Sequence, residues 1–398
     1  MRTSICNSCA VPPPAAAMTT ERIALVVTDF EDGGVERNLS HLALGLARLG
    51  VATWLLVGDP DHAYLRGLAP GVRVLRVTEP RTEFLRDFIQ RERPQWLVTG
   101  KLADDLAALE ARAGLAPAAA GATRLVAAVG TLMSGRFESH RWNPWKTRRE
   151  TGRIHACYRQ LDGITAVSAA VASDLRRVFG VTQVPVAVLA NPILPDDLAD
   201  LAAAPCPHPW LAQPRGPDRP EVLVALGGLR KVKGFDDLLR AFARLHRPRA
   251  RLIIIGEGKE RRRLTQLAAQ LGLDERLDLP GFVANPFPYL AGADLLVLSS
   301  RREGLPNALV EAMALGTPVV ATDCTAGVRD LLRDGRLGPL PRTGHLGDLT
   351  AALDATLRWI AQNALDREEL RQAAEPYRLI PAARAYLEFF RSLPVPDG

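Results

Sequence analysis

The chain has 398 residues, and its 50 Lys and Arg against 44 Asp and Glu give a formal net charge of +6 at pH 7. This length suits two domains of ordinary size, and no apolar run approaches the roughly 20 residues that a membrane-spanning helix needs. The basic balance fits phosphorylated ligands or an anionic membrane surface, whereas the lack of RNA-stacking and zinc-finger patterns argues against nucleic acid.

The first 17 residues have no regular pattern, and Met18 stands directly before the first apolar strand, so we expect translation to start at Met18. Five cysteines are scattered along the chain, and such an odd, sparse set fits a reducing cytoplasm. Cys6 and Cys9 form a C-x-x-C without further ligands nearby, and Asp59-Pro60-Asp61 reads as turn chemistry. We therefore expect no metal site and no cofactor.

Residues 18–194 alternate short apolar runs with helical segments, which is the βαβ rhythm of a doubly wound parallel sheet. The runs are Ile23 to Thr28, Val51 to Val57, Val72 to Val77, Trp96 to Thr99, Leu125 to Val129 and Ile164 to Val167. The first run leads into Gly33 and Gly34, where the backbone can approach a ligand at the start of the next helix. Taken alone, these two glycines also fit a plain tight turn.

Basic residues are concentrated between Arg124 and Arg177, where ten cations and four acids give +6, the formal charge of the whole chain. Two tryptophans lie among cations in the middle of this region, a pattern typical of a surface that meets anionic lipids. A solvated loop and helix with a partly buried tryptophan explains the same composition, and both interpretations stay open. The candidate membrane-surface residues are Arg141, Trp142, Trp145, Lys146, Arg148 and Arg149.

A composition shift divides the chain after residue 194. Residues 195–220 hold seven prolines and no sustained periodicity, so we expect an interdomain linker there. A second doubly wound domain is expected over residues 221–374, with strands such as Val222 to Leu226 and Leu252 to Ile255. Residues 375–398 are expected to form a C-terminal helix.

The first loop of the second domain runs from Gly227 to Gly234 and contains Arg230 and Lys233. Glycines beside cations at a strand-to-helix turn can cradle a phosphate, because the backbone can approach closely and the cations neutralise its charge. A basic loop is more often merely solvated. This one, however, lies at the same sheet edge as the loop described next if the domain is doubly wound.

Two carboxylates eight positions apart, Glu303 and Glu311, flank the start of a helix that follows the apolar run Leu295 to Ser300. Open parallel sheets bind ligands at the carboxyl ends of their strands, and helix N-termini attract anions. Carboxylates at such a place can also accept hydrogen bonds from sugar hydroxyls. Each glutamate alone reads as an ordinary surface or helix charge, but the combined pattern is more specific.

The chain here resembles family 4 of the retaining glycosyltransferases, which have the GT-B fold of two Rossmann-like doubly wound domains facing across a cleft. The resemblance extends through most of the chain and is carried by Glu303-Gly304-Leu305-Pro306-Asn307, Glu311-Ala312-Met313 and Gly316-Thr317-Pro318-Val319-Val320. It implies an N-terminal acceptor domain, a C-terminal domain that binds a nucleotide diphosphate sugar, and a final helix that packs back on the N-terminal domain.

The resemblance also implies roles for single residues. Glu303, Lys233 and Arg230 would be the catalytic groups, with Glu311 on the ribose of the donor. The other donor-binding residues would be Gly227, Gly228, Phe282, Val283, Gly304, Leu305, Pro306 and Asn307. Gly33 and Gly34 would form the acceptor or phosphate loop, and His140 is a candidate for the same side.

Two positions depart from the family pattern. Gly228 stands where relatives have an arginine, a charge that Arg230 can supply, and Gly130 stands where many relatives have a histidine. The function we expect is metal-independent transfer of a hexose or N-acetylhexosamine, from UDP in preference to GDP, to a glycan or lipid-linked acceptor in envelope polysaccharide or lipopolysaccharide synthesis. The protein would be cytoplasmic or peripheral on the inner face of the membrane. A nucleotide-sugar epimerase and a non-catalytic nucleotide-sugar binding protein remain as alternatives.

Overall fold

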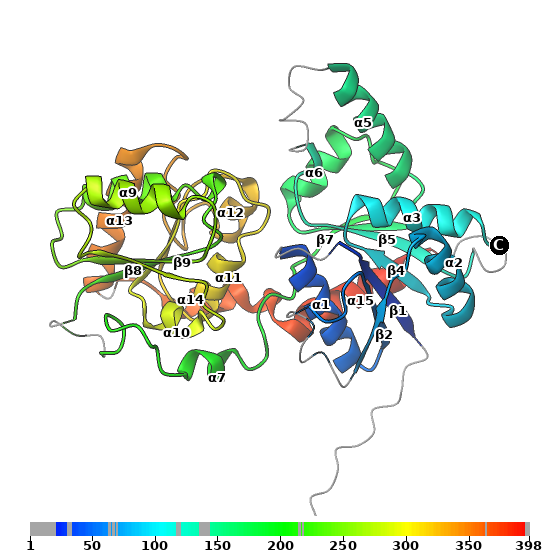
Figure 1. The fold of residues 1–398 in the computed structure, drawn as a ribbon, viewed down its shortest axis with the longest axis horizontal. Helices are drawn as coiled ribbons and strands as arrows, with labels where there is room; N and C mark the ends of the chain where they lie inside the picture. The colour runs from blue at the N-terminus through cyan, green and yellow to red at the C-terminus, as the bar shows by residue number, and fades with distance from the viewer. Residues whose placement is uncertain are drawn as a thin grey trace, which may run out of the picture.

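Two parallel β-sheets organise the computed structural model, each at the centre of its own lobe (Figure 1). The structure describes residues 21–394 except 30–33, 63–64, 66–67, 69–70, 117–120, 135–143, 214–215, 217–218 and 363. In these residues the first sheet has seven strands in the order β3-β2-β1-β4-β5-β6-β7, and the second has five in the order β10-β9-β8-β11-β12. The prediction of two doubly wound α/β sheets is confirmed.

The inner strands of the first sheet have side chains buried on both faces, as their apolar runs require, while its two edge strands are partly exposed. Its strands are β1 (Arg22–Val27), β2 (Ala52–Val57), β3 (Val72–Arg76), β4 (Trp96–Thr99), β5 (Arg124–Val129), β6 (Gly163–Ala166) and β7 (Val186–Val188). Its helices are α1 (Gly34–Arg48), α2 (Arg81–Glu92), α3 (Leu102–Ala113), α5 (Pro144–Tyr158) and α6 (Ala169–Arg177). The short edge strand β7 was not expected from the sequence.

The second sheet repeats this plan at smaller size, with one apolar cluster on each of its faces. Its strands are β8 (Val222–Leu226), β9 (Arg251–Ile255), β10 (Leu277–Gly281), β11 (Leu295–Leu298) and β12 (Val319–Ala321). The helices around it are α8 (Phe235–Ala243), α9 (Arg261–Gln270), α10 (Phe287–Gly292), α11 (Asn307–Ala314), α12 (Ala326–Leu331), α13 (Leu346–Ala361) and α14 (Arg367–Ala374), with the 3-10 turns η3 (Lys231–Lys233) and η4 (Glu375–Tyr377).

Two chain crossings join the lobes and lie side by side. The backbone amides of Ile193 and Leu194 both donate to the carbonyl of Tyr377, at 3.0 Å each. Beyond this point α15 (Leu379–Ser392) runs onto the N-terminal lobe, where it packs against α1 (Figure 1) and where Trp96 Nε1 donates to the carbonyl of Phe390 at 2.8 Å. The paired crossings form the hinge between the lobes.

The segment 195–220, which we expected to be a linker, is packed rather than extended. It contains α7 (Leu198–Ala203), and Leu198 and Leu211 are buried in the core of the C-terminal lobe. Arg219 is also buried and donates to both carboxylate oxygens of Asp294 at 2.6 and 2.7 Å. The sequence did not reveal this packing, because isolated leucines separated by prolines show no helical or strand periodicity.

Candidate active-site cleft

A cleft of about 340 Å³ lies between the carboxyl edges of the two sheets. The N-terminal lobe contributes the start of α1 and the residues after β5, and the C-terminal lobe contributes the ends of β8 and β11 and the start of α11. Parallel sheets direct their loops to this edge, so the loops of both lobes face one another across the opening. This edge is where the sequence placed both candidate loops of the C-terminal lobe.

Glu303 and Lys233 form an ion pair inside the cleft. Lys233 Nζ donates to Glu303 Oε1 at 2.6 Å, and Ser300 Oγ donates to the same oxygen at 2.6 Å. The Lys233 side chain is 23% exposed and the Glu303 side chain 12% exposed, so both remain accessible to a ligand in the cleft. The loop after β8 and the loop after β11, separate in sequence, thus present one positive and one negative group together.

The turn that carries Lys233 is held against β11 by its backbone. Gly234 has φ +62°, and a Cβ there would lie 2.1 Å from the carbonyl oxygen of Ser299, so this position accepts only glycine without a shift. Ser299 Oγ donates to the carbonyl of Lys233 at 2.9 Å. Arg301 ties the same turn to Asp237 on α8 at 2.7 Å. These contacts fix the direction from which Lys233 enters the cleft.

Glu311 bridges the two lobes. Its side chain is 1% exposed, and Oε1 accepts a hydrogen bond from Arg37 NH2 on α1 at 2.8 Å. Both residues line the cleft. A guanidinium from the N-terminal lobe therefore holds the carboxylate that the resemblance assigns to ribose.

The lobes approach closely at Gly304. A Cβ on Gly304 would lie 2.6 Å from the carbonyl oxygen of Gly130, so any larger residue would push the lobes apart. Gly130 is the position where the family resemblance led us to expect a histidine, and a Cβ there would make only an ordinary contact, 3.4 Å from Val35. The missing side chain leaves this part of the cleft to Gly130 and Thr131.

The structure brings many of the expected site residues together and leaves others apart. The expected residues that line the cleft are Gly227, Lys233, Glu303, Gly304, Leu305, Pro306, Asn307 and Glu311. Gly228, Arg230, Phe282 and Val283 do not line it, and the Phe282 side chain is 73% exposed. Gly33, His140, Arg141 and Trp142 lie outside the described residues, and Gly34 begins α1.

The basic surface that we expected near a membrane lies on α5. Trp145 is 83% exposed, and Lys146, Arg148 and Arg149 on the same helix are also exposed. In Figure 1, α5 projects from the N-terminal lobe on the side away from α15. The buried-tryptophan interpretation is therefore wrong for Trp145.

Sequence reasoning assigned no site role to three polar groups of the cleft. Arg37, Asn38 and Asn191 all line it from the N-terminal lobe or the hinge. The amide oxygen of Asn38 is buried and has no hydrogen-bond partner among the described residues. Arg37 and Asn38 stand three and four positions after Gly34, so the Gly33-Gly34 loop was the sequence feature that could have identified them.

Burial and charge shift two groups close to the cleft. His41 on α1 has its Nδ1 2.9 Å from the carbonyl oxygen of Pro192, and burial, followed by the charge of Arg37, lowers its pKa to about 4. Since a carbonyl only accepts, Nδ1 carries the proton of the neutral ring. Burial, followed by the charge of Glu303, raises the pKa of the Cys324 thiol to about 11, so it stays protonated at neutral pH.

The arrangement is suited to an anionic, hydroxyl-bearing ligand. Lys233 and the N-terminal end of α11 offer positive potential, while Glu303 and Glu311 offer acceptors for hydroxyl groups. Preorganised donors of this kind stabilise negative charge that develops on a leaving group.

Two family models match the chain in tandem. Residues 32–197 match the model described as Glycosyltransferase Family 4, and residues 220–360 match the model described as Glycosyl transferases group 1. The boundary between the two matches falls in the segment that follows the hinge.

Curated relatives match over part of their length. A lipopolysaccharide core biosynthesis glycosyltransferase, LpsE of Rhizobium meliloti, is 36% identical over 144 residues, which are 36% of this chain and 41% of that protein. The N-acetylgalactosamine-N,N'-diacetylbacillosaminyl-diphospho-undecaprenol 4-alpha-N-acetylgalactosaminyltransferase of Campylobacter jejuni is 30% identical over 167 residues, 42% of this chain and 46% of that one. The chain thus spans less than half the length of these relatives in the matched segments.

Solved structures match over nearly the whole chain. Anabaena Alr3699/HepE in complex with UDP and glucose superimposes with a TM-score of 0.75 at 18% identity, covering 94% of this chain and 100% of that one. The lipopolysaccharide outer core galactosyltransferase WaaB in its apo form gives 0.68 at 18% identity, covering 93% and 99%. At this identity the likeness establishes the fold.

Proposed function

We propose that this chain, which belongs to glycosyltransferase family 4 with the GT-B fold, is a retaining enzyme that moves a sugar from a nucleotide diphosphate sugar to a glycan or lipid-linked acceptor. The observation that carries the proposal is the meeting of Lys233, Glu303 and Glu311 with the start of α11 in one interdomain cleft. Each of these groups has a counterpart in a nucleotide diphosphate sugar.

The leaving diphosphate places the largest electrostatic demand on the site. As the bond between sugar and phosphate breaks, negative charge grows on the phosphate oxygens, and Lys233 with the amides at the start of α11 stabilises it. These groups allow the reaction to proceed without a metal ion. Glu303 orients Lys233 through the 2.6 Å ion pair and accepts hydrogen bonds from the sugar.

Glu311 is assigned to the ribose. Ribose hydroxyls are donors, as the guanidinium of Arg37 is, so the nucleotide takes over the hydrogen bond that Arg37 makes to Glu311. Neither glutamate acts as a covalent nucleophile in this proposal. Attack occurs on the face from which the diphosphate departs, which retains the configuration of the sugar.

The donor and acceptor classes rest on the relatives. UDP is favoured as the nucleotide, because solved structures with this fold contain UDP. Relatives named for lipopolysaccharide core synthesis and for a diphospho-undecaprenol acceptor support a hexose or N-acetylhexosamine transferred in envelope glycan synthesis.

A thermal-shift screen of nucleotide sugars tests the donor, because a ligand that binds only the native state raises the melting temperature. We expect a UDP-sugar to give the largest shift, and transfer assays with that donor then follow. Turnover of the donor to an epimer without acceptor would replace the proposal with an epimerase. Binding without transfer to any glycan would replace it with a non-catalytic binding protein.

We further propose that α5 holds the protein on an anionic membrane surface. An exposed Trp145 beside Lys146, Arg148 and Arg149 combines an interfacial aromatic group with cations, each contributing about 1 kcal/mol near such a surface. Within the described residues, no helix is both long and apolar enough to cross a bilayer.

Flotation with phosphatidylglycerol vesicles tests this membrane contact. The double substitution Arg148→Glu, Arg149→Glu is expected to abolish flotation, since it reverses the charge of the surface beside Trp145. The matched control, Arg240→Glu with Arg244→Glu, makes the same charge change on exposed residues at α8 of the other lobe. Equal flotation of both double variants would disprove the assignment to α5.

A further inference from the structure

Three buried side-chain atoms lack a hydrogen-bond partner among the described residues: Asn38 Oδ1, Arg86 Nε and Thr165 Oγ1. Two of them, on Asn38 and Thr165, line one small cavity that adjoins the active-site cleft. Asn38 belongs to α1 and Thr165 to β6, so the two residues meet only through the fold. Buried polar atoms are rarely left without a partner, and two that line the same space indicate a shared one.

The small cavity lies where α1 packs on the carboxyl ends of β5 and β6, with α15 alongside α1 (Figure 1). Much of its lining is apolar, from side chains such as Leu39, Leu42 and Val129, and its volume is about 20 Å³. A single water molecule needs roughly 10–15 Å³ of such space, whereas small-ligand sites span roughly 300–1,000 Å³. The cavity therefore has room for one water and excludes a sugar or a phosphate.

Tyr386 on α15 and Asn191 near the hinge bring further polar groups to the small cavity. Both side chains are buried, and the Tyr386 hydroxyl donates to Asn191 Oδ1 at 3.2 Å. Burial raises the pKa of Tyr386 to about 12, so the hydroxyl keeps its proton at neutral pH. Because Asn191 receives that proton, it is not available to Thr165 Oγ1, which lies beside the same hydroxyl. The Tyr386 oxygen, however, can still accept a hydrogen bond.

The number of polar groups matches the needs of a buried water, which typically makes about three hydrogen bonds. A water has two protons to donate, and Asn38 Oδ1 and the Tyr386 oxygen are acceptors for them. Its own oxygen can accept from the Thr165 hydroxyl, which is a donor as well as an acceptor. One water thus satisfies both of the unpartnered atoms without leaving a proton or an acceptor unused.

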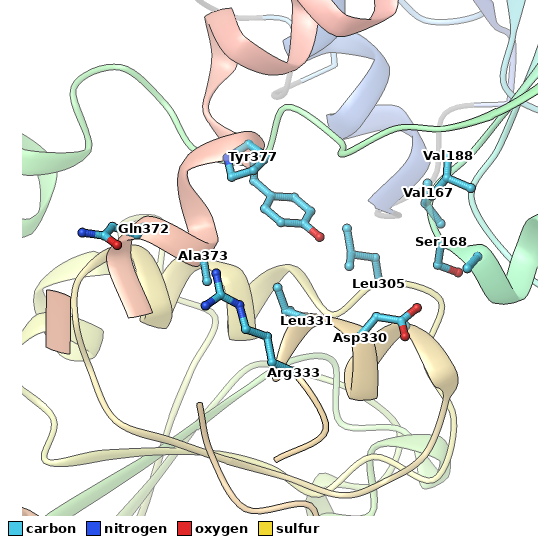
Figure 2. A pocket seen from close by; sticks show the side chains of 13 residues that line it. Val167, Ser168, Val188, Leu305, Asp330, Leu331, Arg333, Gln372, Ala373 and Tyr377 are labelled. Carbon is cyan, nitrogen blue, oxygen red and sulfur yellow. The ribbon is translucent and has the colours of Figure 1, made fainter. Parts of the chain in front are cut away.

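A larger hollow of about 320 Å³ between the lobes offers a contrast, and Val167 lines both spaces (Figure 2). Figure 2 shows Tyr377 and Asp330 at its walls, and Asp330 is exposed to solvent. Among the described residues, none of the three unpartnered atoms lines this hollow. Size alone indicates no occupant there, whereas the small cavity combines room for one water with buried atoms that need one.

We propose that the small cavity binds one ordered water, which donates to Asn38 Oδ1 and to the Tyr386 oxygen and accepts from the Thr165 hydroxyl. The inference does not depend on the proposed transfer function. Asn38 and Asn191 line the cleft as well as the cavity, so the water supports this part of the cleft from behind. By holding the oxygen of the Asn38 amide inward, it leaves the N–H donors of that amide for the cleft side.

A high-resolution crystal structure of the wild-type protein tests the site directly. We expect electron density for a water within hydrogen-bond distance of Asn38 Oδ1, Thr165 Oγ1 and the Tyr386 oxygen. A cavity without such density, or an Asn38 oxygen turned to a protein donor instead, overturns the inference.

Oxygen-17 magnetic relaxation dispersion tests the site in solution, because it counts the waters held inside a protein. Thr165→Ile replaces the hydroxyl and adds one methyl carbon where the water would lie, whereas Thr165→Ser keeps the hydroxyl. We expect one long-lived water fewer in Thr165→Ile than in the wild type, and an unchanged number in Thr165→Ser. Equal numbers in Thr165→Ile and the wild type would contradict the site.

A second substitution keeps the solution test decisive if Thr165→Ile does not fold. Thr165→Val removes the hydroxyl without adding an atom to the side chain, and it should shorten the residence time of the water. The matched control is Thr53→Val in the same sheet, since the Thr53 hydroxyl donates to the carbonyl of Val51 at 2.9 Å and does not line the cavity. Thr165→Val with a water signal equal to that of Thr53→Val and the wild type would count against the hydrogen bond to Thr165.

Discussion

Replacing Lys233 with alanine removes the one cation that the C-terminal lobe places directly on Glu303 in the described structure. The ammonium group lies 2.6 Å from Glu303 Oε1, and the rest of the turn is fixed by backbone contacts that the substitution leaves in place. Lys233→Ala therefore removes the positive charge while leaving the fold in place. We expect a large loss of turnover and a small loss of stability.

The magnitudes follow from the geometry. Removing one preorganised donor to a developing negative charge typically lowers turnover about 100- to 1,000-fold. The cost to folding is on the order of 1–2 kcal/mol, because both side chains are partly exposed and Ser300 still donates to Glu303 at 2.6 Å. For 398 residues that unfold together, this corresponds to a fall of roughly 1–3 °C in the melting temperature.

The assay is the release of nucleoside diphosphate at saturating donor and acceptor, alongside a thermal melt. Lys231→Ala is the matched control, since Lys231 belongs to the same 3-10 turn but is exposed and does not line the cleft. The control should retain its turnover. Near-wild-type turnover in folded Lys233→Ala protein would refute the role of Lys233.

Three further predictions concern the groups around the cleft. Arg37→Ala leaves the Glu311 carboxylate without its partner, so the empty protein should lose about 1–3 kcal/mol and UDP should raise its melting temperature more than that of the wild type; equal UDP shifts would contradict displacement of Arg37 by ribose. The folded pKa of His41 is about 4 against 6.5, so the native state resists protonation: stability is full above pH 6.5 and falls by about 3 kcal/mol as pH drops to 4. In urea melts between pH 6.5 and 4, the free energy of unfolding should fall less for His41→Gln than for the wild type. An identical pH dependence of the two proteins would refute the lowered pKa of His41. Cys324, with a thiol pKa of about 11, should react with maleimide at pH 8 far more slowly in the folded than in the unfolded protein, as peptide mass mapping would show; equal rates would be inconsistent with its enclosure.

The strands and loops of the cleft were predictable because each depends on local sequence. Unbroken apolar runs such as Leu295 to Leu298 specify strands buried on both faces, and glycine at 234 with Pro306 marks the strand-to-helix turns. Once both sheets are doubly wound, the carboxyl ends of their strands must bring Lys233 and Glu303 to one edge.

Contacts between the two lobes could not be predicted from local sequence patterns. Arg37 and Glu311 are 274 positions apart, and their ion pair depends on how the hinge closes, which no local pattern encodes. The packing of Leu198 and Leu211 was hidden by the prolines between them.

A crystal structure of the protein with UDP tests the central claim most directly. The account predicts UDP in the interdomain cleft, with its diphosphate between Lys233 and the start of α11 and its ribose hydroxyls on Glu311 in place of Arg37. UDP bound elsewhere, or bound in the cleft with Arg37 still on Glu311 and the diphosphate away from Lys233, would contradict it.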